Sequence, residues 1–156
     1  MSTPLGANKL AQVAFVVRDI EAAKVRWAAV LGVEPPNTIV TAPGHEARQT
    51  HRGQPSDAQA KLCFFDLGGV QLELIEPMGG ESTWQEALDQ NGEGFHHIAF
   101  WVENMPASAE GLKAHGIERI QRGDMGGGGQ YGYFDATQPL ACVIELLERD
   151  RTEFSD

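Results

Sequence analysis

The 156-residue sequence predicts an α+β fold in which two tandem βαβββ modules form one cupped, mixed sheet. The main observation is an internal repeat. The stretches Leu10–Glu34 and Phe95–Glu118 show the same order of features at an offset of 85 residues: an alternating strand, an Asx residue, an amphipathic helix and a glycine. The second observation is that each helix is followed by three further strand-like segments.

The first copy contains a well-defined helix signal. Asp19 is expected to cap this helix, and Gly32 is expected to end it. The side facing the core is expected to carry Ile20, Ala23, Trp27, Val30 and Leu31. Three strand segments follow, with the sequences NTIV, KLCFFDLG and VQLELIE.

The second copy repeats this plan. Asn104 is expected to cap its helix, and Pro106 suits the first helical turn. Met105 and Leu112 are expected to face the core, and Gly116 to end the helix. The strand segments that follow are IERIQ, GQYGYFDA and ACVIELLE.

These elements predict a single domain made of two modules and a linker. The linker ESTWQEALDQNGEG reads as a short helix that starts near the capping sequence STWQ and ends at Gly92. Hydrophobic residues make up 42% of the chain, which suffices for one core. The predicted ranges are 9–77 for the first module, 94–148 for the second, 9–148 for the whole domain, and 1–8 and 149–156 for the tails.

Composition limits the functions and locations that fit the chain. With 22 acidic and 12 basic residues the net charge is -10, which disfavours nucleic acid and anionic membranes and favours a small-molecule ligand. No apolar run approaches the roughly 20 residues of a membrane helix, and no secretory signal is visible, so a cytoplasmic location is expected. Cys63 and Cys142 lie in apolar segments without CxxC spacing, which is typical of reduced core thiols.

Two adjacent histidines interrupt the apolar segment GFHHIAFWV. Side chains alternate across a strand, so the histidines face opposite ways. The expected helix-covered face carries His96, Ile98, Phe100 and Val102. The expected cup face carries His97, Ala99 and Trp101. Within the repeat, His97 falls on Gln12, so a polar residue recurs at the same place, while His96 is expected to pack or to support His97.

The last strand of each module also contains a carboxylate among apolar residues. Glu73 in VQLELIE and Glu145 in ACVIELLE point, by alternation, to the cup face shared by Gln12 and His97. Taken singly, each of the four also fits a solvated or hydrogen-bonded strand residue. Buried together, two carboxylates, an imidazole and an amide oxygen match a divalent cation such as Zn²⁺, Ni²⁺, Co²⁺, Mn²⁺ or Mg²⁺.

The motifs ELIEP, GEGFHHIAF and VIELLE resemble the vicinal oxygen chelate superfamily, which includes glyoxalases, bleomycin-resistance proteins and extradiol dioxygenases. The run from LELIEP to FWVENM is most similar to methylmalonyl-CoA epimerase-like proteins. The resemblance covers about residues 9–148. It implies a glyoxalase-like fold and a metal site at Gln12, Glu73, His97 and Glu145.

The sequence departs from each branch of that superfamily. The epimerases usually carry histidine where this chain has Gln12, whereas the set Gln, Glu, His, Glu is similar to that of zinc-type glyoxalase I. The glyoxalases place a basic residue at Val16 and an asparagine at Pro77. The base that epimerases carry on the third strand would map near Leu62, which cannot serve. Extradiol dioxygenases need two histidines and a glutamate on iron, a triad that Gln12 breaks.

The resemblance favours a metal-dependent isomerase or epimerase that moves a proton next to a carbonyl, on an acyl-CoA or carboxylic-acid substrate. Glu145 and Glu73 are then the candidate catalytic residues as well as ligands. Two alternatives stay open. One is a glyoxalase I-like lyase, and the other is a non-catalytic protein that sequesters a ligand without metal.

Two further expectations concern partners. The polar loop Thr41–Gln59 carries His45, Arg48, His51 and Arg52, which are either solvated or form a rim for an anionic substrate. A homodimer is predicted because exposed edges of two short sheets invite pairing.

Overall fold

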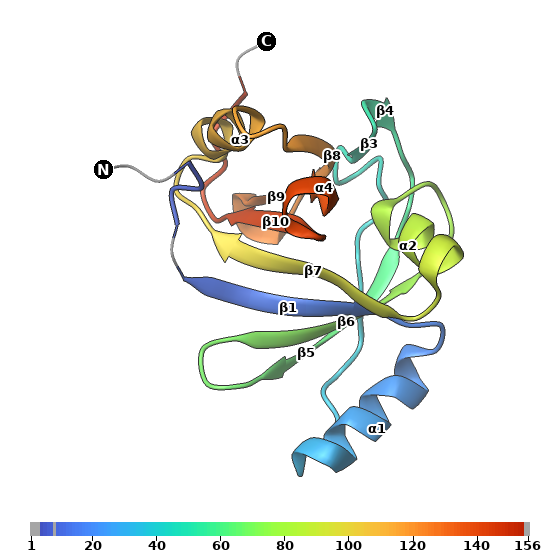
Figure 1. Cartoon of the computed structure of the whole chain (residues 1–156). Coiled ribbons are helices and arrows are strands. Elements are labelled where there is room, and N and C mark those ends of the chain that lie inside the picture. Colours follow the sequence, from blue (N-terminus) through green and yellow to red (C-terminus); the bar gives the residue numbers. More distant parts are fainter. Residues whose placement is uncertain (1–3, 8, 155–156) are drawn as a thin grey trace.

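The computed structural model describes residues 4–7 and 9–154, in which ten strands form one curved, unclosed sheet (Figure 1). The strands are β1 Leu10–Val16, β2 Ile39–Val40, β3 Thr50–His51, β4 Gln54–Pro55, β5 Ala60–Asp66, β6 Gln71–Pro77, β7 Gly94–Trp101, β8 Glu118–Asp124, β9 Gln130–Ala136 and β10 Cys142–Glu148. The helices are α1 Ile20–Leu31, α2 Thr83–Asn91, α3 Met105–Lys113 and α4 Thr137–Leu140, with a short 3₁₀ turn η1 at Gly126–Gly128.

The strand order β2-β5-β6-β1-β7-β10-β9-β8-β3-β4 shows how two modules are joined. In the first module the opening strand β1 lies parallel to the last strand β6, and in the second β7 lies parallel to β10. The modules meet where β1 and β7 pair antiparallel. The predicted α+β fold of two βαβββ modules with a cupped mixed sheet is therefore confirmed.

Helix α1 begins and ends as predicted. The Asp19 side chain accepts a hydrogen bond from the first turn, and Gly32 follows the helix in the left-handed conformation at φ 71°. The apolar side of the helix, where Ile20 is fully buried, packs on β5 and β6. The prediction that Val30 faces the core is wrong, since this residue is 82% exposed. It lies about 60° around the helix from Trp27, on the flank beyond the sheet.

Helix α3 repeats this arrangement in the second module. Asn104 caps it and Pro106 lies in its first turn, as predicted. Met105 and Leu112 are buried against the outer face of β7, β9 and β10. The helix ends at Lys113, two residues earlier than predicted, and Gly116 lies in the turn that follows, with φ 75°.

The linking helix α2 packs inside the curvature of the sheet. The Ser82 side chain caps it and Gly92 follows its last residue, as the sequence indicates. Trp84 and Leu88 pack against residues of β1, β5, β6 and β9, including Val16. Because α1 and α3 cover the outer face, α2 and the inner face enclose a separate space between them.

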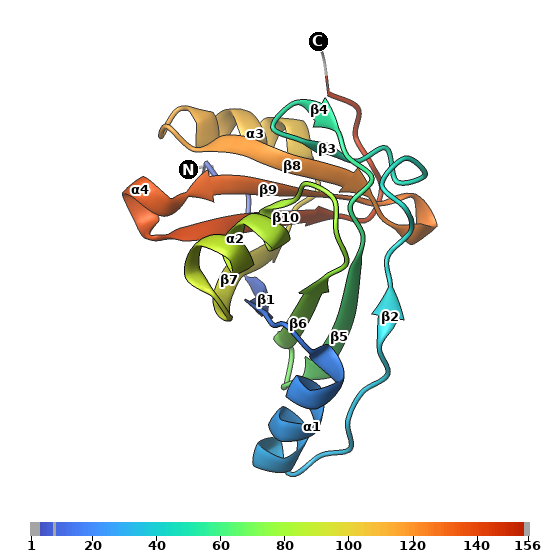
Figure 2. The same cartoon turned by 90° about the vertical axis from the view of Figure 1, so that its right-hand side faces the viewer.

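The segment between α1 and β5 is more ordered than the polar loop expected from the sequence. It leaves α1, pairs as β2 with β5 at one end of the sheet, and then forms the β3–β4 hairpin at the other end (Figure 2). There β3 pairs with β8 of the second module. The segment therefore spans both modules across the concave side of the sheet.

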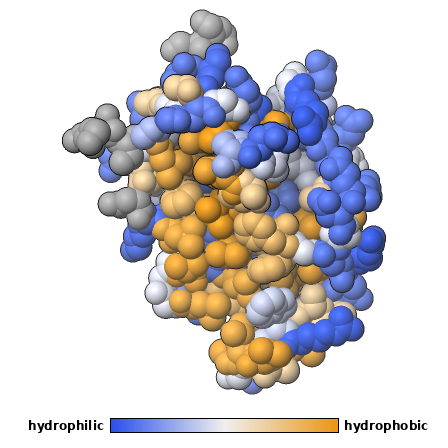
Figure 3. Space-filling view, viewed as in Figure 1, coloured by the Kyte–Doolittle hydropathy of each residue, from blue (hydrophilic) through white to orange (hydrophobic). Residues whose placement is uncertain are grey.

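Apolar side chains are also exposed on the outer surface. Figure 3 shows a broad hydrophobic area on the face seen in Figure 1. A homodimer is predicted from the edges of two short sheets, but the inner edges β1 and β7 pair with each other. The free edges of the described sheet are β2 and β4, and the homodimer stays a prediction.

Both cysteines are free thiols within the apolar packing of the sheet. Cys63 is buried and Cys142 is half-buried, in agreement with the prediction of unpaired core thiols. Burial raises the pKa of Cys63 to about 11, so this thiol is a poor nucleophile at neutral pH. Among the described residues, none of the helices has the length and apolar character needed to cross a membrane.

Candidate metal centre and adjoining cavity

Four neighbouring strands at the middle of the sheet bring the four predicted side chains together. Gln12 lies on β1, Glu73 on β6, His97 on β7 and Glu145 on β10. All four side chains are at most 8% exposed and point into the cup. The neighbouring residues Leu72 and Leu74, and Ile144 and Leu146, pack outward under the helices. Strand alternation therefore placed these side chains on the correct face.

Two alanines at equivalent positions of the repeat, Ala14 and Ala99, lie between the four side chains. Ala14 is paired in the sheet with Glu73 on one side and with His97 on the other. Ala99 has the same place between the glutamine and the second glutamate. Both alanines are fully buried. Because their side chains are single methyl groups, they leave space above the sheet where the polar groups converge.

The nitrogen and oxygen atoms of this cluster lie within reach of a single ion. His97 Nε2 is 2.8 Å from Glu145 Oε2 and 3.4 Å from Glu73 Oε2. One ligand atom from each of these residues lies within 4.8 Å of the others. His97 Nε2 is buried and has no hydrogen-bond partner of ordinary geometry. An unpartnered buried nitrogen beside two carboxylates fits a metal ligand.

The Gln12 amide lies between the two carboxylates and Gln71. One end of the amide is 3.3 Å from Glu73 Oε2 and 3.1 Å from Glu145 Oε2. With its nitrogen at this end, the amide donates to both carboxylates. With its oxygen there, the amide is a ligand for a cation held by the carboxylates. Gln12 can therefore serve the cluster in either orientation.

The imidazole of His97 is held from behind by its neighbour in the sequence. His96 Nδ1 lies 2.8 Å from His97 Nδ1, so one of the two nitrogens donates to the other. When His97 Nδ1 carries the proton, its Nε2 presents a lone pair to the cluster. His96 is itself 4% exposed. The expected contact of His96 with His97 is present, but the prediction that His96 lies on the opposite, helix-covered face is wrong. The pairing of β1 with β7 shifts register between His97 and Phe95, and the His96 ring lies 5.2 Å from that of Tyr133.

Burial and mutual charge control the protonation of the cluster. Burial raises the pKa of Glu73, an effect that the Glu145 charge adds to and the His97 imidazole opposes. Burial alone would lower the pKa of His97, but the two carboxylates raise it to about 9. The cluster therefore needs positive charge for balance, from protons or from a divalent cation.

The cluster opens into a cavity of about 480 Å³, within the range of small-molecule sites. The aromatic side chains that line one wall of this cavity were not predicted from the sequence. Trp84 Nε1 donates to the Tyr133 hydroxyl at 2.9 Å, and the Tyr131 hydroxyl donates to Gln49 Oε1 at 2.8 Å. The ring centre of Tyr133 is 5.1 Å from that of His97. The only sequence signal was the spacing YGY, which places both tyrosines on one face of β9.

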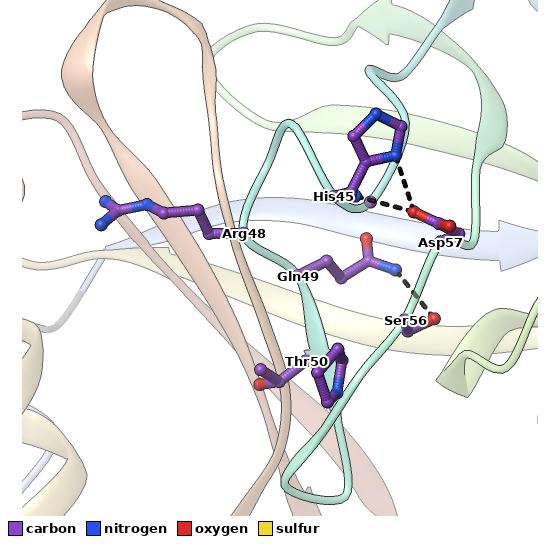
Figure 4. Close-up of a pocket in the computed structure, with 8 residues that line it drawn as sticks. His45, Arg48, Gln49, Thr50, Ser56 and Asp57 are labelled. Atoms are coloured by element: carbon purple, nitrogen blue, oxygen red, sulfur yellow. Dashed lines mark hydrogen bonds and ion pairs between the residues drawn. The ribbon is translucent and has the colours of Figure 1, made fainter.

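The four basic residues of the loop do not form one anion site. In Figure 4 the His45 ring lies against Asp57, at 2.8 Å, while Arg48 extends away from them. Arg48 binds Asp124, which lines the cavity, at 2.7 Å. The remaining two, His51 and Arg52, both pair with Glu86. Arg52 lines a different cavity, so the prediction of a shared rim fails for it, while Arg48 stays near the cavity mouth.

The structure shows where the residues lie that differ from those of epimerases and glyoxalases. Leu62 lines the cavity, so no carboxylate base comes from that strand position. Val16 is 1% exposed in the apolar inner cluster, where a glyoxalase would need a cation for a ligand carboxylate. The residues that can exchange a proton inside the cavity therefore include the two glutamates of the cluster.

The paired modules and the converging side chains define a glyoxalase-like class of cupped-sheet protein with a candidate metal centre. The family model described as Glyoxalase/Bleomycin resistance protein/Dioxygenase superfamily matches residues 11–134, and the chain belongs to this superfamily.

The relatives include epimerases of acyl-CoA compounds. An ethylmalonyl-CoA/methylmalonyl-CoA epimerase from Cereibacter sphaeroides is 30% identical over 143 residues, which cover 89% of this chain and 96% of that protein. The mitochondrial methylmalonyl-CoA epimerase of Bos taurus is 29% identical over 146 residues, covering 92% and 74%. A Streptomyces coelicolor methylmalonyl-CoA epimerase solved with 2-nitronate-propionyl-CoA has a TM-score of 0.66 and 22% identity, covering 91% and 97%. At that identity the structural likeness supports the fold alone.

Proposed function

We propose that the protein is a metal-dependent epimerase or isomerase that moves the proton next to the carbonyl of an acyl-CoA substrate. The observation that carries this proposal is the convergence of Glu73 and Glu145 on His97. The similarity to acyl-CoA epimerases supports the reaction class. The metal ligands are Gln12, Glu73, His97 and Glu145.

The geometry suits removal and return of a proton on two sides of a planar intermediate. A divalent cation held by these residues would stabilise the negative charge that develops on the substrate oxygen. Glu73 and Glu145 come from β6 and β10, which flank the central pair β1 and β7. Each glutamate takes up or returns the α-proton on its own side.

The proposal is tested by replacing each glutamate separately. Glu73→Gln and Glu145→Gln keep the side-chain size, and we expect each to lose exchange of solvent deuterium at the α-carbon by about 10²-fold or more. In a two-base reaction the residual exchange in the two variants involves opposite epimers. The probes are 2-methyl-branched acyl-CoA thioesters, including methylmalonyl-CoA. Bound metal is measured in parallel, so that lost exchange is separated from lost metal.

The matched control is Glu76→Gln. Glu76 lies on the same strand as Glu73, but its carboxylate binds Lys61 at 3.0 Å and does not line the cavity. This variant should exchange at the wild-type rate. Full exchange in both Glu73→Gln and Glu145→Gln would rule out the proposed role of the glutamates.

A glyoxalase I-like lyase is the second candidate. The amide oxygen of Gln12 in the cluster favours it, because that ligand set resembles zinc-type glyoxalase I. The buried Val16 disfavours it, because the wall has no cation there for a glutathione carboxylate. Turnover of a glutathione hemithioacetal without α-proton exchange of acyl-CoA would decide for the lyase. Protein without stoichiometric metal would favour a ligand-sequestering protein instead.

The remaining expectations about partners and location belong to this proposal. We expect an acyl-CoA, and hence an anionic ligand, to enter with its charged part outside the cavity. A homodimer through the apolar outer face of Figure 3, and a cytoplasmic location, also remain predictions.

A further inference from the structure

The cavity wall has a chemistry unlike that of an anion-binding site. Among the described residues that line it there is no lysine, arginine or histidine. The ionisable acids on its wall are Glu73, Asp124 and Glu145. Most of the other lining residues are apolar or aromatic, among them Leu62 and Leu147. A ligand in this space therefore meets no fixed positive charge except a cation in the cluster.

The arginines near the cavity mouth are already paired. Arg48 Nε lies 2.7 Å from Asp124 Oδ2. Arg122 and Arg151 lie 3.2 Å and 3.0 Å from Asp124 Oδ1. None of the three lines the cavity. Their guanidinium groups are held by Asp124 outside the cavity, so the cavity interior itself has no cationic side chain.

Most polar atoms of the aromatic wall already take part in hydrogen bonds within the protein. The Trp84 N–H is donated to the Tyr133 hydroxyl, and the Tyr131 hydroxyl is donated to Gln49 and accepts from Gln121 at 3.1 Å. Burial raises the pKa of both tyrosines above the ordinary value, so they stay neutral. The Tyr133 proton remains as a neutral donor, suited to an uncharged oxygen.

The charge of the loaded site limits what the rest of the substrate can carry. A divalent cation and the carboxylates of Glu73 and Glu145 sum to zero. A ligand carboxylate bound at the cation would make the loaded site net negative, and one placed elsewhere in the cavity would be unpaired among Leu62, Phe64 and Leu147. Unpaired buried charge is strongly unfavourable. An uncharged apolar group would instead gain from leaving water.

We propose that the acyl group of the substrate is uncharged and apolar, such as a branched alkyl or aryl group, rather than a malonyl-type group with a second carboxylate. This inference rests on the proposed function, because it assigns the substrate class of the same site. The preferred substrate would then lack the second carboxylate that a malonyl group carries.

The test compares chelating ligands that differ in one group. Hydroxamates present two oxygens to a metal, so they act as probes of the Ni²⁺-loaded protein, with binding followed by the absorption of the ion. 3-Methylbutanohydroxamate carries an isopropyl group where malonate monohydroxamate carries a carboxylate. Benzohydroxamate probes the aryl class. We expect the isopropyl and phenyl ligands to bind at least about tenfold more tightly than the carboxylate ligand, consistent with the cost of an unpaired buried charge.

A pair of lysine variants tests the cause of that preference. Ile39 lines the cavity but is 51% exposed, so Ile39→Lys adds a cation at the wall without burying it. Val30 lies on α1, is 82% exposed and does not line the cavity, so Val30→Lys changes the net charge equally elsewhere. Only Ile39→Lys should strengthen binding of malonate monohydroxamate.

Each outcome decides the inference. Equal or tighter binding of the carboxylate ligand to the wild type overturns it, as does failure of the apolar ligands to bind the metal-loaded protein. An equal gain in both lysine variants also counts against it, because the effect would then come from net charge. Failure to bind Ni²⁺ refutes the metal site and the inference together. Loss of the ligand preference with normal deuterium exchange refutes the substrate class alone.

Discussion

Removing the two adjacent histidines one at a time distinguishes a metal ligand from a supporting residue. His97 directs Nε2 at the two carboxylates, whereas His96 contacts the other ring nitrogen of His97 at 2.8 Å. We expect His97→Ala to lose tight metal binding. His96→Ala should keep the metal but bind it about 10- to 100-fold more weakly, as is typical when a partner of a ligand is lost.

The stabilisation by metal gives the expected magnitudes. At a free metal concentration about 100 times Kd, binding stabilises the fold by about 2.7 kcal/mol. For a chain of this size each kcal/mol shifts Tm by about 2–4 °C, so the wild type should gain roughly 5–11 °C. At the same concentration a 10- to 100-fold weaker site retains about 0.4–1.4 kcal/mol, or roughly 1–6 °C. His97→Ala should gain nothing.

The assay is thermal unfolding of chelator-treated protein across a metal titration, with metal content measured after gel filtration. The relevant quantity is the gain in Tm on adding metal. The metal-free Tm itself also changes, because removal of His97 leaves two buried carboxylates without their imidazole partner. Higher metal should restore the full gain in His96→Ala. If His97→Ala retained the gain and His96→Ala lost it at every concentration, the assigned facing of β7 would be refuted.

Two more predictions concern the segment that spans the modules. Arg48→Ala should raise KM for an acyl-CoA by about 2- to 5-fold, as expected for an exposed charge at the cavity mouth. Arg52→Ala is the control, because Arg52 lines another cavity. Equal KM values for the two variants in steady-state kinetics would contradict this prediction. Gly44→Ala should lower Tm by roughly 2–12 °C, because its Cβ would lie 1.8 Å from the Ser56 carbonyl oxygen and overpacking costs about 1–3 kcal/mol. Gly126→Ala has open space and should leave Tm unchanged in calorimetry; equal loss in both variants would point to a general effect of alanine.

The four cluster residues could be predicted from the sequence because their placement depends on local rules. The repeat pairs His97 with Gln12, and alternation then assigns His97 to the cup face. Alternation alone gave the wrong face for His96, because the register of the β1–β7 pairing shifts between His97 and Phe95 and both histidine rings lie beside Tyr133. The same rule separates Glu73 and Glu145 from the leucines and isoleucine beside them. Short-range periodicity was therefore sufficient to bring distant residues to one face, even though the sequence did not show the distances.

The features that were missed depend on contacts between distant segments. The pairing of β3 with β8, and of Arg52 with Glu86, joins residues far apart in the chain. No local pattern indicates which acid a loop arginine will meet. Trp84, Tyr131 and Tyr133 read as ordinary apolar strand or helix residues, since aromatic side chains are common in cores. Their role as a cavity wall follows only once α2 is placed inside the sheet.

The symmetry of the cluster explains why one module cannot form it alone. Ala14 of the first module lies between Glu73 of the same module and His97 of the other. Ala99 of the second module lies between Glu145 of the same module and Gln12 of the other. Each alanine thus brings together one side chain from each module. The candidate metal centre depends on the antiparallel join of β1 and β7, and a shift of one residue in that pairing would separate both pairs at once.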